Sequence, residues 1–390
     1  MAKLKEYILV INSGSATLKF KIFHQDNLNV ALTGIVEKIG LPGSFISIQE
    51  NSSKRILIKN YPEGISNHIQ ALQIVLAHLK HWKRKIKIIG HRVVHGGQDF
   101  TRPTLINKKN LVQLKKYNQL APLHNPINLA CIETCLNLLP AIKNVAVFDT
   151  AFYKTIPDYA YLYSIPYQYY LDFSVRRYGF HGISHQYVAL KAAEALKKPL
   201  KKLKLITCHL GSGCSATAVK FGQAIETSMG FTPLEGLTMG TRSGDLDATV
   251  PLFLMKKLNI TAGEIEDILN KKSGLLGIFG YSNDMRDIMT AAGYRIPGYK
   301  PPKKFNQKEK QRGKLALKIF IYDIVRYIGS YATIMGGVDY IIFTAGIGER
   351  NSNVRNLIMK DIRRAWPKVK SLTIQTNEEL MIAQEVKNFG

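Results

Sequence analysis

The sequence has few cysteines, few acidic residues and only a short apolar stretch near its start, and each scarcity argues against a class of protein. Four cysteines in 390 residues are too few for a disulfide framework, and their spacing lacks the CxxC pairs of a zinc site. The apolar run that follows Lys3 and Lys5 is about five residues long, too short for a signal peptide or a membrane span. We therefore expect buried thiols and a cytoplasmic protein with no membrane partner.

Acidic residues are outnumbered, because 54 Lys and Arg stand against 28 Asp and Glu and give a net charge of +26. An excess of this size suggests a phosphate-bearing partner, with nucleic acid as the obvious candidate. The basic residues are nevertheless spread along the chain, with clusters at 80–87, 197–204 and 295–314, and no helix-turn-helix, zinc-finger, RRM or KH signature accompanies them. We interpret the charge as a solvated, lysine-rich surface that attracts anionic substrates, and we do not expect nucleic acid to bind.

Two stretches of the chain repeat one phrase, Ile-Asn-Ser-Gly-Ser-Ala-Thr at 11–17 and Leu-Gly-Ser-Gly-Cys-Ser-Ala-Thr at 210–217. Each follows an apolar, β-branched run, so each predicts a β-hairpin with a Gly/Ser-rich tip. Such a tip can wrap a phosphate, because glycines allow close backbone approach and N–H and hydroxyl groups replace the hydration shell. Either one alone is compatible with an ordinary hairpin, whereas the pair indicates a duplicated architecture.

Three further motifs extend this interpretation. A buried-strand pattern at 339–344 enters Thr-Ala-Gly-Ile-Gly, a turn that can bring backbone against a nucleotide. The strand 145–148 ends in Asp149, and Arg242 lies among glycines in Met-Gly-Thr-Arg-Ser-Gly-Asp. With a length that favours two domains, this combination predicts a duplicated α/β kinase that holds ATP between its halves.

The rest of the chain is organised as two halves and a join. A join at 151–178 contains eight tyrosines, which we interpret as interface or hinge packing. The segment 292–314 is rich in Pro, Gly and Lys and predicts an exposed loop. The remaining elements expected in the first half are strands at 31–37, 44–49 and 86–90, helices at 65–79 and 109–118, and a capped turn at 121–126 that opens another helix.

The chemistry of such a site requires permanent positive charge, because two anions must be neutralised before they approach. Arginine suits this task with a planar fork that holds carboxylate or phosphate bidentately. Arg92 and Arg242 lie in Gly-rich surroundings that suit close approach, although each could instead be a surface ion-pair partner. His181, flanked by Gly179 and Gly182, could stabilise charge on a transferring phosphoryl group or could be structural.

At this point the chain resembles the acetate and propionate kinase family. The resemblance rests on phrases that recur in order over nearly the whole chain: 10–15 (Val-Ile-Asn-Ser-Gly-Ser), 90–97 (Gly-His-Arg-Val-Val-His-Gly-Gly), 148–152, 177–182, 239–247 and 376–379. It implies an α/β fold of two duplicated ribonuclease-H-like domains of the actin, Hsp70 and sugar kinase superfamily, with a cleft between them. The implied N-terminal acetokinase domain is 1–150, completed by a C-terminal helix at about 377–390, and the implied nucleotide-binding domain is 151–376.

The same resemblance implies a homodimer that transfers the γ-phosphate of ATP reversibly to acetate, giving acetyl phosphate and ADP, with Mg²⁺ or Mn²⁺ as cofactor. The implied catalytic residues are Asp149, His181 and Arg242, and the implied metal side is formed by Asn12 and Glu378. Acetate would contact Arg92, Val94, Leu123, His124, Phe180 and Pro233. The nucleotide would contact Ser15, Thr17, Lys19, His209, Leu210, Gly211, Ser212, Gly213, Asp284, Met285, Arg286, Gly346, Ile347, Gly348 and Arg350.

Two positions depart from the family pattern, Ser212 and Arg350, each of which replaces the usual Asn. Both departures bear on nucleotide affinity and choice more than on reaction type. Two alternatives therefore stay open beside an acetate kinase. One is a propionate kinase of the same family, and the other is a catalytically weakened, basic homologue that binds anions or nucleic acid.

Overall fold

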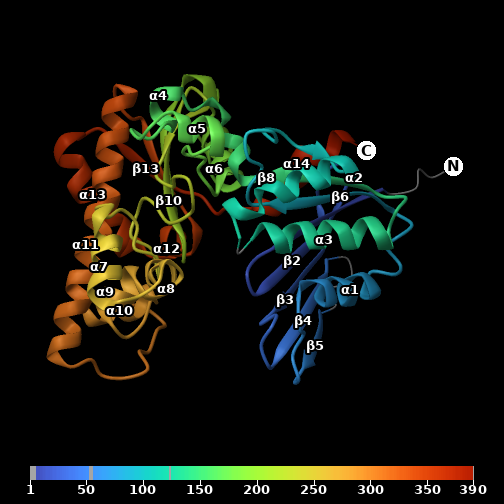
Figure 1. Cartoon of the computed structure of the whole chain (residues 1–390), viewed down its shortest axis with the longest axis horizontal. Coiled ribbons are helices and arrows are strands. Elements are labelled where there is room, and N and C mark those ends of the chain that lie inside the picture. Colours follow the sequence, from blue (N-terminus) through green and yellow to red (C-terminus); the bar gives the residue numbers. More distant parts are fainter. Residues whose placement is uncertain (1–5, 52–55, 123, 390) are drawn as a thin grey trace. The chain divides into compact units, whose positions relative to one another are not determined.

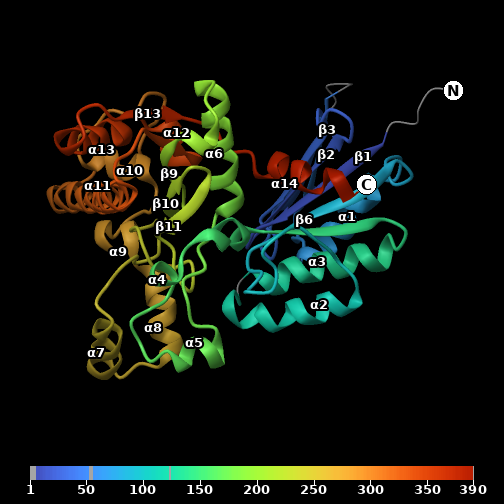
Figure 2. The same ribbon diagram turned by 90° about the horizontal axis from the view of Figure 1, so that it is seen from above.

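The computed structural model describes residues 6–51, 56–122 and 124–389. Contacts divide the chain into two units, Met1–Phe152 with Asn377–Gly390 and Tyr153–Thr376. Each unit is built on one mixed sheet with helices (Figures 1 and 2). No helix in these described ranges is both long and apolar enough to cross a membrane.

The first unit contains an eight-stranded sheet in the order β5-β4-β3-β2-β1-β6-β8-β7. Its strands are β1 Tyr7–Ser13, β2 Thr17–His24, β3 Val30–Glu37, β4 Ser44–Glu50, β5 Ile56–Tyr61, β6 Ile86–Val93, β7 Thr104–Leu105 and β8 Lys143–Phe148. Strands β1 to β5 form an antiparallel meander, whereas β6 pairs in parallel with both β1 and β8. The parallel strands β1 and β6 therefore end at the same edge of the sheet, where the functional side chains gather.

Helices cover both faces of this sheet. They are α1 His68–His78, α2 Lys108–Lys115, α3 Asn125–Leu138 and α14 Glu378–Val386, with short turns η1 Lys116–Leu120, η2 Asp149–Thr155 and η5 Lys387–Phe389. Helices α1 and α3 bury apolar side chains with Leu9 and Ile11 of β1 in one core cluster. Helix α14 lies on the opposite face (Figure 2). Gly90 leaves room for α14 on this face, because a Cβ at Gly90 would lie 2.8 Å from the Ile382 side chain.

The second unit contains a five-stranded sheet in the order β11-β10-β9-β12-β13. Its strands are β9 Lys204–Leu210, β10 Cys214–Lys220, β11 Gln223–Thr227, β12 Tyr340–Thr344 and β13 Lys370–Thr373. Its helices are α4 Asp158–Tyr161, α5 Gln168–Phe173, α6 Gly182–Leu196, α7 Thr249–Leu258, α8 Ala262–Asp267, α9 Gly274–Phe279, α10 Met285–Ala291, α11 Gln307–Met335, α12 Ala345–Arg350 and α13 Ser352–Ala365, with η3 Leu200–Lys202 and the π-turn η4 Ile268–Lys272. Helices α6 and α11 lie on opposite faces of the sheet (Figure 2).

The two sheets share one plan, which confirms the duplication expected from the repeated phrase. In each, a hairpin (β1–β2 or β9–β10) continues antiparallel into a third strand, and its first strand pairs in parallel with a later one, β6 or β12. Both Gly/Ser phrases form the tips of these hairpins. The fold is thus the α/β class with mixed sheets that the sequence predicts.

One expectation is wrong in part, because the loop predicted at 292–314 ends at Asn306. Residues from Gln307 onward form the first turns of α11. The Asn306 side chain accepts a hydrogen bond from Glu309 N at 2.9 Å, and the Glu309 carboxylate accepts one from Asn306 N at 2.8 Å. This capping box starts the helix despite the surrounding lysines. Its pattern, Asn-x-x-Glu, can be recognised in the sequence.

Candidate active site

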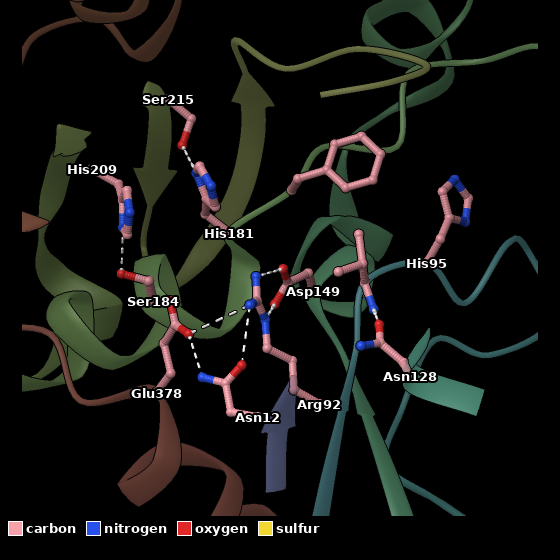
Figure 3. A network of polar contacts seen from close by, with 12 residues as sticks. Asn12, Arg92, His95, Asn128, Asp149, His181, Ser184, His209, Ser215 and Glu378 are labelled. Atoms are coloured by element: carbon pink, nitrogen blue, oxygen red, sulfur yellow. Dashed lines mark hydrogen bonds and ion pairs between the residues drawn. The ribbon is translucent and has the colours of Figure 1, made fainter. Parts of the chain in front are cut away.

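Arg92 is the centre of a polar cluster in the first unit. It comes from the end of β6, and its guanidinium donates to both carboxylate oxygens of Asp149, with Nη2 to Oδ2 at 2.6 Å and Nε to Oδ1 at 3.2 Å (Figure 3). Asp149 follows β8, the parallel neighbour of β6, so the two side chains project from adjacent strand ends. Arg92 Nη1 also donates to Asn12 Oδ1 at 3.2 Å and lies 3.9 Å from Glu378 Oε2. The motifs at residues 12, 92, 149 and 378 thus converge.

Burial makes these charges strongly interdependent. The Asp149 side chain is 1% exposed and that of Arg92 is 16% exposed. Burial opposes the charge on Arg92, but attraction to Asp149 and Glu378 outweighs it and raises the pKa of Arg92. Arg92 therefore carries a permanent charge with its donors already directed at protein oxygens.

Carboxylates outnumber cations in this cluster. Asn12 Nδ2 donates to Glu378 Oε2 at 3.1 Å and to Glu379 Oε1 at 2.9 Å, so one amide holds both carboxylates. Lys21 Nζ forms an ion pair with Glu379 Oε2 at 3.1 Å. With Asp149, the cluster holds three carboxylates against Arg92 and Lys21. Such a set of oxygens with excess negative charge suits a hard divalent cation.

Helix α3 holds the strand ends in place. Asn128 Oδ1 accepts from Val94 N and its Nδ2 donates to Ser13 O, both at 3.1 Å, which ties β6 to the first hairpin. Asn125 exchanges two further hydrogen bonds with the backbone of His95, at 3.0 and 2.9 Å. Burial lowers the pKa of His95 to about 3, so this histidine is neutral.

The other residues predicted for the first unit are placed as follows. Val94 is buried, and His124 precedes Asn125 at the start of α3. Leu123 lies outside the described residues. The tip of the first hairpin closes with Gly14 N donating to Thr17 O at 2.8 Å. Three predicted nucleotide contacts follow around it: Ser15, Thr17 and Lys19, of which Ser15 and Lys19 are exposed.

His181 is the centre of a second cluster, which lies in the second unit. It immediately precedes α6 in a left-handed backbone conformation, with φ of 59°, which is strained for a residue other than glycine and typical of functional sites. Its Nδ1 lies 2.8 Å from Ser215 Oγ on β10, and its ring stacks on His209 of β9 with centroids 4.2 Å apart. His209 Nδ1 in turn lies 2.8 Å from Ser184 Oγ (Figure 3). Two imidazoles are thus fixed face to face by hydroxyl groups.

Arg242 is a partly buried cation that no described carboxylate contacts. Its Nη1 donates to the Pro233 carbonyl at 3.2 Å, and its other contact is Met239 Sδ at 3.8 Å. Burial is the main influence on this guanidinium and lowers its pKa. A desolvated arginine with no counter-ion is a site that an anion completes.

Gly213, at the tip of the second hairpin, lies beside both of these groups. A Cβ added there would lie 3.5 Å from His181 Nε2 and 3.5 Å from Arg242 Nη1. The hairpin backbone, the imidazole and the guanidinium are therefore neighbours in the second unit. Backbone N–H groups, an imidazole and a guanidinium are the kinds of donor that bind phosphoryl groups.

Three Gly-rich segments meet around the same hairpin tip. Gly240 N donates to Ser212 O at 3.0 Å, and a Cβ at Gly240 would lie 3.5 Å from Asn283 Nδ2. A Cβ at Gly211 would lie 3.6 Å from Ala345 Cβ, at the start of α12. The predicted nucleotide residues at 209–213 and 346–348 are thus brought together by β9, β10 and β12.

Two other predicted nucleotide contacts have their own partners. Arg286 donates to both oxygens of Asp284, with the shortest contact at 2.6 Å, and its guanidinium covers the Tyr299 ring at 4.7 Å. Hydrogen bonding by Arg286 lowers the pKa of Asp284. Met285 is buried, and Arg350 is exposed at the end of α12. Nearby, Asn351 Oδ1 caps α13 by accepting from Val354 N.

The acetate contacts expected in the second unit are rigidly held. Phe180 is buried, and its carbonyl accepts from Tyr153 Oη at 2.5 Å. The carbonyl of Pro233 is the acceptor for Arg242. Val94, another expected apolar contact, belongs to the first unit.

The sequence interpretation missed several polar residues: Lys21, Glu379, Asn125, Asn128, Ser184, His185, Thr207 and Ser215. Glu379 and Asn125 were inside quoted motifs and needed only their neighbours to be identified. Thr207 and Ser215 can be recognised in the sequence as polar residues within apolar strands. A polar residue in such a strand indicates a buried hydrogen bond. The pairing of these groups depends on strand register, which no local pattern gives.

Comparison with known proteins identifies the family of the chain. The sequence profile of the Acetokinase family matches residues 7–365. The chain is 45% identical to the acetate kinase of Caldicellulosiruptor saccharolyticus, covering 98% of this chain and 99% of that protein, and 46% identical to that of Thermoanaerobacter pseudethanolicus, covering 98% of each.

Solved structures show the same relationship. Porphyromonas gingivalis acetate kinase superposes with a TM-score of 0.85 at 36% identity, over 98% of this chain and 99% of that one. A propionate kinase from Francisella tularensis gives a TM-score of 0.86, also at 36% identity, over 97% of this chain and 98% of that one. The chain belongs to the Acetokinase family, the group of acetate kinases.

Proposed function

We propose that this protein transfers the γ-phosphoryl group of ATP to acetate, reversibly, giving acetyl phosphate and ADP. The observation that carries the proposal is Arg242, a desolvated guanidinium with no carboxylate partner among the described residues, beside Gly213 and His181. An anion that enters this space restores the balance of charge. The transferring phosphoryl group is such an anion.

The chemical step needs little covalent help from the protein. A carboxylate oxygen of acetate forms a bond to the γ-phosphorus while the bond from that phosphorus to the β–γ bridging oxygen breaks, leaving ADP. Negative charge is spread over the three equatorial oxygens in the transition state. We propose that Arg242 and the imidazole of His181 donate to those oxygens, and preorganised donors of this kind are worth about 2.7–4 kcal/mol each.

Acetate would be neutralised on the side of Arg92. Because Asp149 accepts two of the hydrogen bonds of Arg92, the guanidinium is locked in one orientation before the acceptor arrives. We propose that Asp149 orients Arg92 and that Val94, Phe180 and Pro233 exclude water from the methyl group. Water must be excluded because a water molecule in place of acetate would hydrolyse ATP.

The residues of the first unit fit a divalent cation, Mg²⁺ or Mn²⁺. No group of three or more His, Cys, Asp or Glu side chains in the described ranges could bind a metal ion by itself. One or two carboxylates plus the phosphates of the substrate are the usual Mg²⁺ environment. Glu378 would hold the ion, whereas Asn12, whose Oδ1 accepts from Arg92, would orient Glu378. When bound, the cation neutralises charge on the β- and γ-phosphates.

The nucleotide would lie along the Gly-rich segments at 209–213 and 346–348, with Asp284, Met285 and Arg286 on its adenosine side and the first hairpin (Ser15, Thr17 and Lys19) near the phosphates. Glycines from three elements lie together here, and the lack of a side chain lets ATP approach their backbone closely. The four free cysteines are buried thiols, which is consistent with the cytoplasmic location we infer for an ATP-dependent enzyme.

We also propose a homodimer. Helices α5 and α7 contain no buried residue, yet they and the residue preceding α5 expose apolar side chains: Tyr167 before α5, Tyr169, Leu171 and Phe173 in α5, and Val250, Leu252, Phe253 and Leu258 in α7. Exposed apolar helices of this kind are typical of subunit interfaces. Light scattering coupled to gel filtration tests this proposal, and a monomer at micromolar concentration contradicts it.

Hydroxylamine trapping tests the reaction. Purified protein with ATP, Mg²⁺ and acetate is expected to form acetyl hydroxamate, and Arg242→Ala is the matched control. Hydroxamate no higher than without enzyme, from folded protein, overturns the proposal. Propionate in place of acetate tests the nearest alternative, which the Francisella tularensis relative favours by its name. A steep salt dependence of binding to duplex DNA would instead support the anion-binding homologue.

A further inference from the structure

A chain of buried hydrogen bonds runs from His181 into the interior of the second unit. His181 Nδ1 lies 2.8 Å from Ser215 Oγ, Ser215 Oγ lies 2.8 Å from His185 Nε2, and His185 Nδ1 lies 2.7 Å from Thr207 Oγ1. Ser215, His185 and Thr207 come from β10, α6 and β9, and each is fully buried. The phosphoryl-transfer chemistry above uses none of these three side chains. Their arrangement therefore calls for a separate explanation.

The hydroxyl of Thr207 decides the direction of this chain. It can donate to His185 Nδ1 at 2.7 Å, or it can accept from that nitrogen and donate its proton to the carbonyl of Thr217 at 3.5 Å. The carbonyl is at the limit of a hydrogen bond, so only the first arrangement uses the Thr207 proton in a short contact, and we take it as the direction of the chain.

The remaining protons follow from that choice. An imidazole that accepts at Nδ1 carries its proton on Nε2, so His185 donates from Nε2 to Ser215 Oγ. Burial lowers the pKa of His185 well below its usual value, which excludes a second proton on the ring. Ser215 accepts from His185 and therefore donates its own proton to His181 Nδ1. His181, an acceptor at Nδ1, carries its proton on Nε2.

We propose that Thr207, His185 and Ser215 are positioning residues that fix the neutral Nε2–H tautomer of His181. This inference rests on the proposed function, in which His181 donates to the transferring phosphoryl group. The atom concerned is His181 Nε2, which faces the tip of the second hairpin, 3.5 Å from where a Cβ of Gly213 would lie. The chain makes a neutral imidazole a donor at that nitrogen, with no need for a proton from solvent.

The groups around His181 are consistent with a neutral donor. The titratable or charged neighbours of the two histidines in the second unit include three groups. They are His209 on β9, which stacks on His181, Tyr153 on η2, whose ring lies 6.5 Å from His185, and Arg242 in the loop before α7. Arg242 already supplies a permanent positive charge. A neutral Nε2–H of His181, which donates a directed hydrogen bond without adding a second charge, is therefore sufficient to bind the phosphoryl group.

The test uses the far end of the chain, which does not touch His181. Thr207→Val removes the hydroxyl and keeps the shape, whereas Thr207→Ser keeps the hydroxyl. We expect kcat to fall about tenfold to a hundredfold in Thr207→Val and Ser215→Ala, the range for removal of a hydrogen bond that orients a functional histidine. KM for ATP should change little, and Thr207→Ser should recover most of the rate. Thr227→Val, which removes a buried hydroxyl of the same sheet outside the chain, is the matched control.

The split between kcat and KM separates a positioning role from a structural one. A positioning role lowers kcat, leaves KM for ATP nearly unchanged and is recovered in Thr207→Ser. A loss of kcat in Thr227→Val as large as that in Thr207→Val, or wild-type kcat in both Thr207→Val and Ser215→Ala, overturns the proposal.

Nitrogen NMR of ¹⁵N-histidine-labelled protein gives a readout that does not depend on activity. The His181 signals, assigned by comparison with His181→Asn, should show an unprotonated Nδ1 and a protonated Nε2 at pH 7.5. A protonated Nδ1 with an unprotonated Nε2 contradicts the chain. If the protein makes no acetyl phosphate but shows the expected tautomer, the proposed reaction fails and the positioning chain stands.

Discussion

Removal of Arg92 and removal of Arg242 should affect catalysis alike and stability differently. Each loses a preorganised charge at the reacting groups, so we expect kcat/KM to fall at least about a hundredfold for Arg92→Ala and for Arg242→Ala. Arg92 neutralises Asp149, whose side chain is 1% exposed, through contacts of 2.6 and 3.2 Å. Arg242 neutralises no carboxylate in the described part of the chain.

The magnitudes follow from these contacts. Removing one partner of a buried ion pair leaves an uncompensated charge and costs about 3–5 kcal/mol. Arg92→Ala should therefore lower the melting temperature of the first unit by about 6–20 °C, at roughly 2–4 °C per kcal/mol for a domain of this size. Arg242→Ala gives up one hydrogen bond to a carbonyl and releases a desolvated charge, so its effect should be within about 1 kcal/mol.

The two tryptophans make the assay specific to each unit. Trp82 lies in the first unit and Trp366 in the second. In a Trp366→Phe background fluorescence reports on the first unit, and in a Trp82→Phe background on the second. Thermal melts should show the Arg92→Ala shift with Trp82 as the reporter. The Arg242→Ala variant should melt close to its parent with Trp366 as the reporter.

A double variant supplies the control. Arg92→Met with Asp149→Asn removes both members of the pair, so stability should return largely while activity stays lost. Equal melting temperatures for Arg92→Ala and its parent would refute the reasoning, because they would mean that the Asp149 carboxylate is compensated without Arg92. Near-normal kinetics in either arginine variant would remove that arginine from the reaction.

Four further predictions follow from the same geometry. Glu378→Gln should raise the Mg²⁺ concentration needed for half-maximal rate more than it raises KM for acetate, and a metal titration checks this. Val94→Ala should increase kcat/KM for propionate relative to acetate by about 10- to 200-fold, the worth of one methylene in an apolar pocket; an unchanged ratio would exclude Val94 from the acceptor site. If Arg350 stacks on the nucleobase, the wild type should use GTP comparably to ATP and Arg350→Asn should sharpen the preference for ATP, whereas equal ATP/GTP ratios in both proteins would mean that Arg350 faces solvent. Burial lowers the pKa of His91 to about 4 and that of His95 to about 3, below the value of about 6.5 in an unfolded chain. Protonation therefore favours the unfolded state, and the first unit should lose stability as the pH falls from 6.5 towards 4. Trp82 fluorescence at graded pH measures this loss, and constant stability over that range would contradict the prediction.

The elements that sequence predicted best are those whose signal is local. The two hairpins were predictable because an apolar strand, a Gly/Ser tip and a second strand occupy fewer than about 20 residues, within reach of short-range patterns. Asp149 was predictable as a strand-end carboxylate for the same reason. The start of α11 at Gln307 was missed because composition outweighed the local capping box of Asn306 and Glu309.

The contacts that define the candidate site were not predictable in this way, because they join distant residues. Asn12 and Glu378 are 366 residues apart, and Arg92 and Asp149 are 57 apart. A resemblance to relatives could name these residues, but it could not show that Arg92 is already paired whereas Arg242 is not. Likewise, the chain from Thr207 to His181 depends on the registers of β9 and β10, and a shift of one residue would turn its side chains to the other face.

Local charge and total charge have opposite signs in this protein. The chain carries +26, yet in the first unit Asp149, Glu378 and Glu379 outnumber Arg92 and Lys21. A lysine-rich surface is screened within about 8–10 Å at physiological ionic strength, so it concentrates anions near the protein but cannot replace charge at the reacting atoms. A bound cation would compensate the excess carboxylate, and a bound anion would compensate Arg242, which contacts no carboxylate among the described residues. A metal–nucleotide complex carries both charges, and for this reason we favour it as the ligand over a nucleic acid.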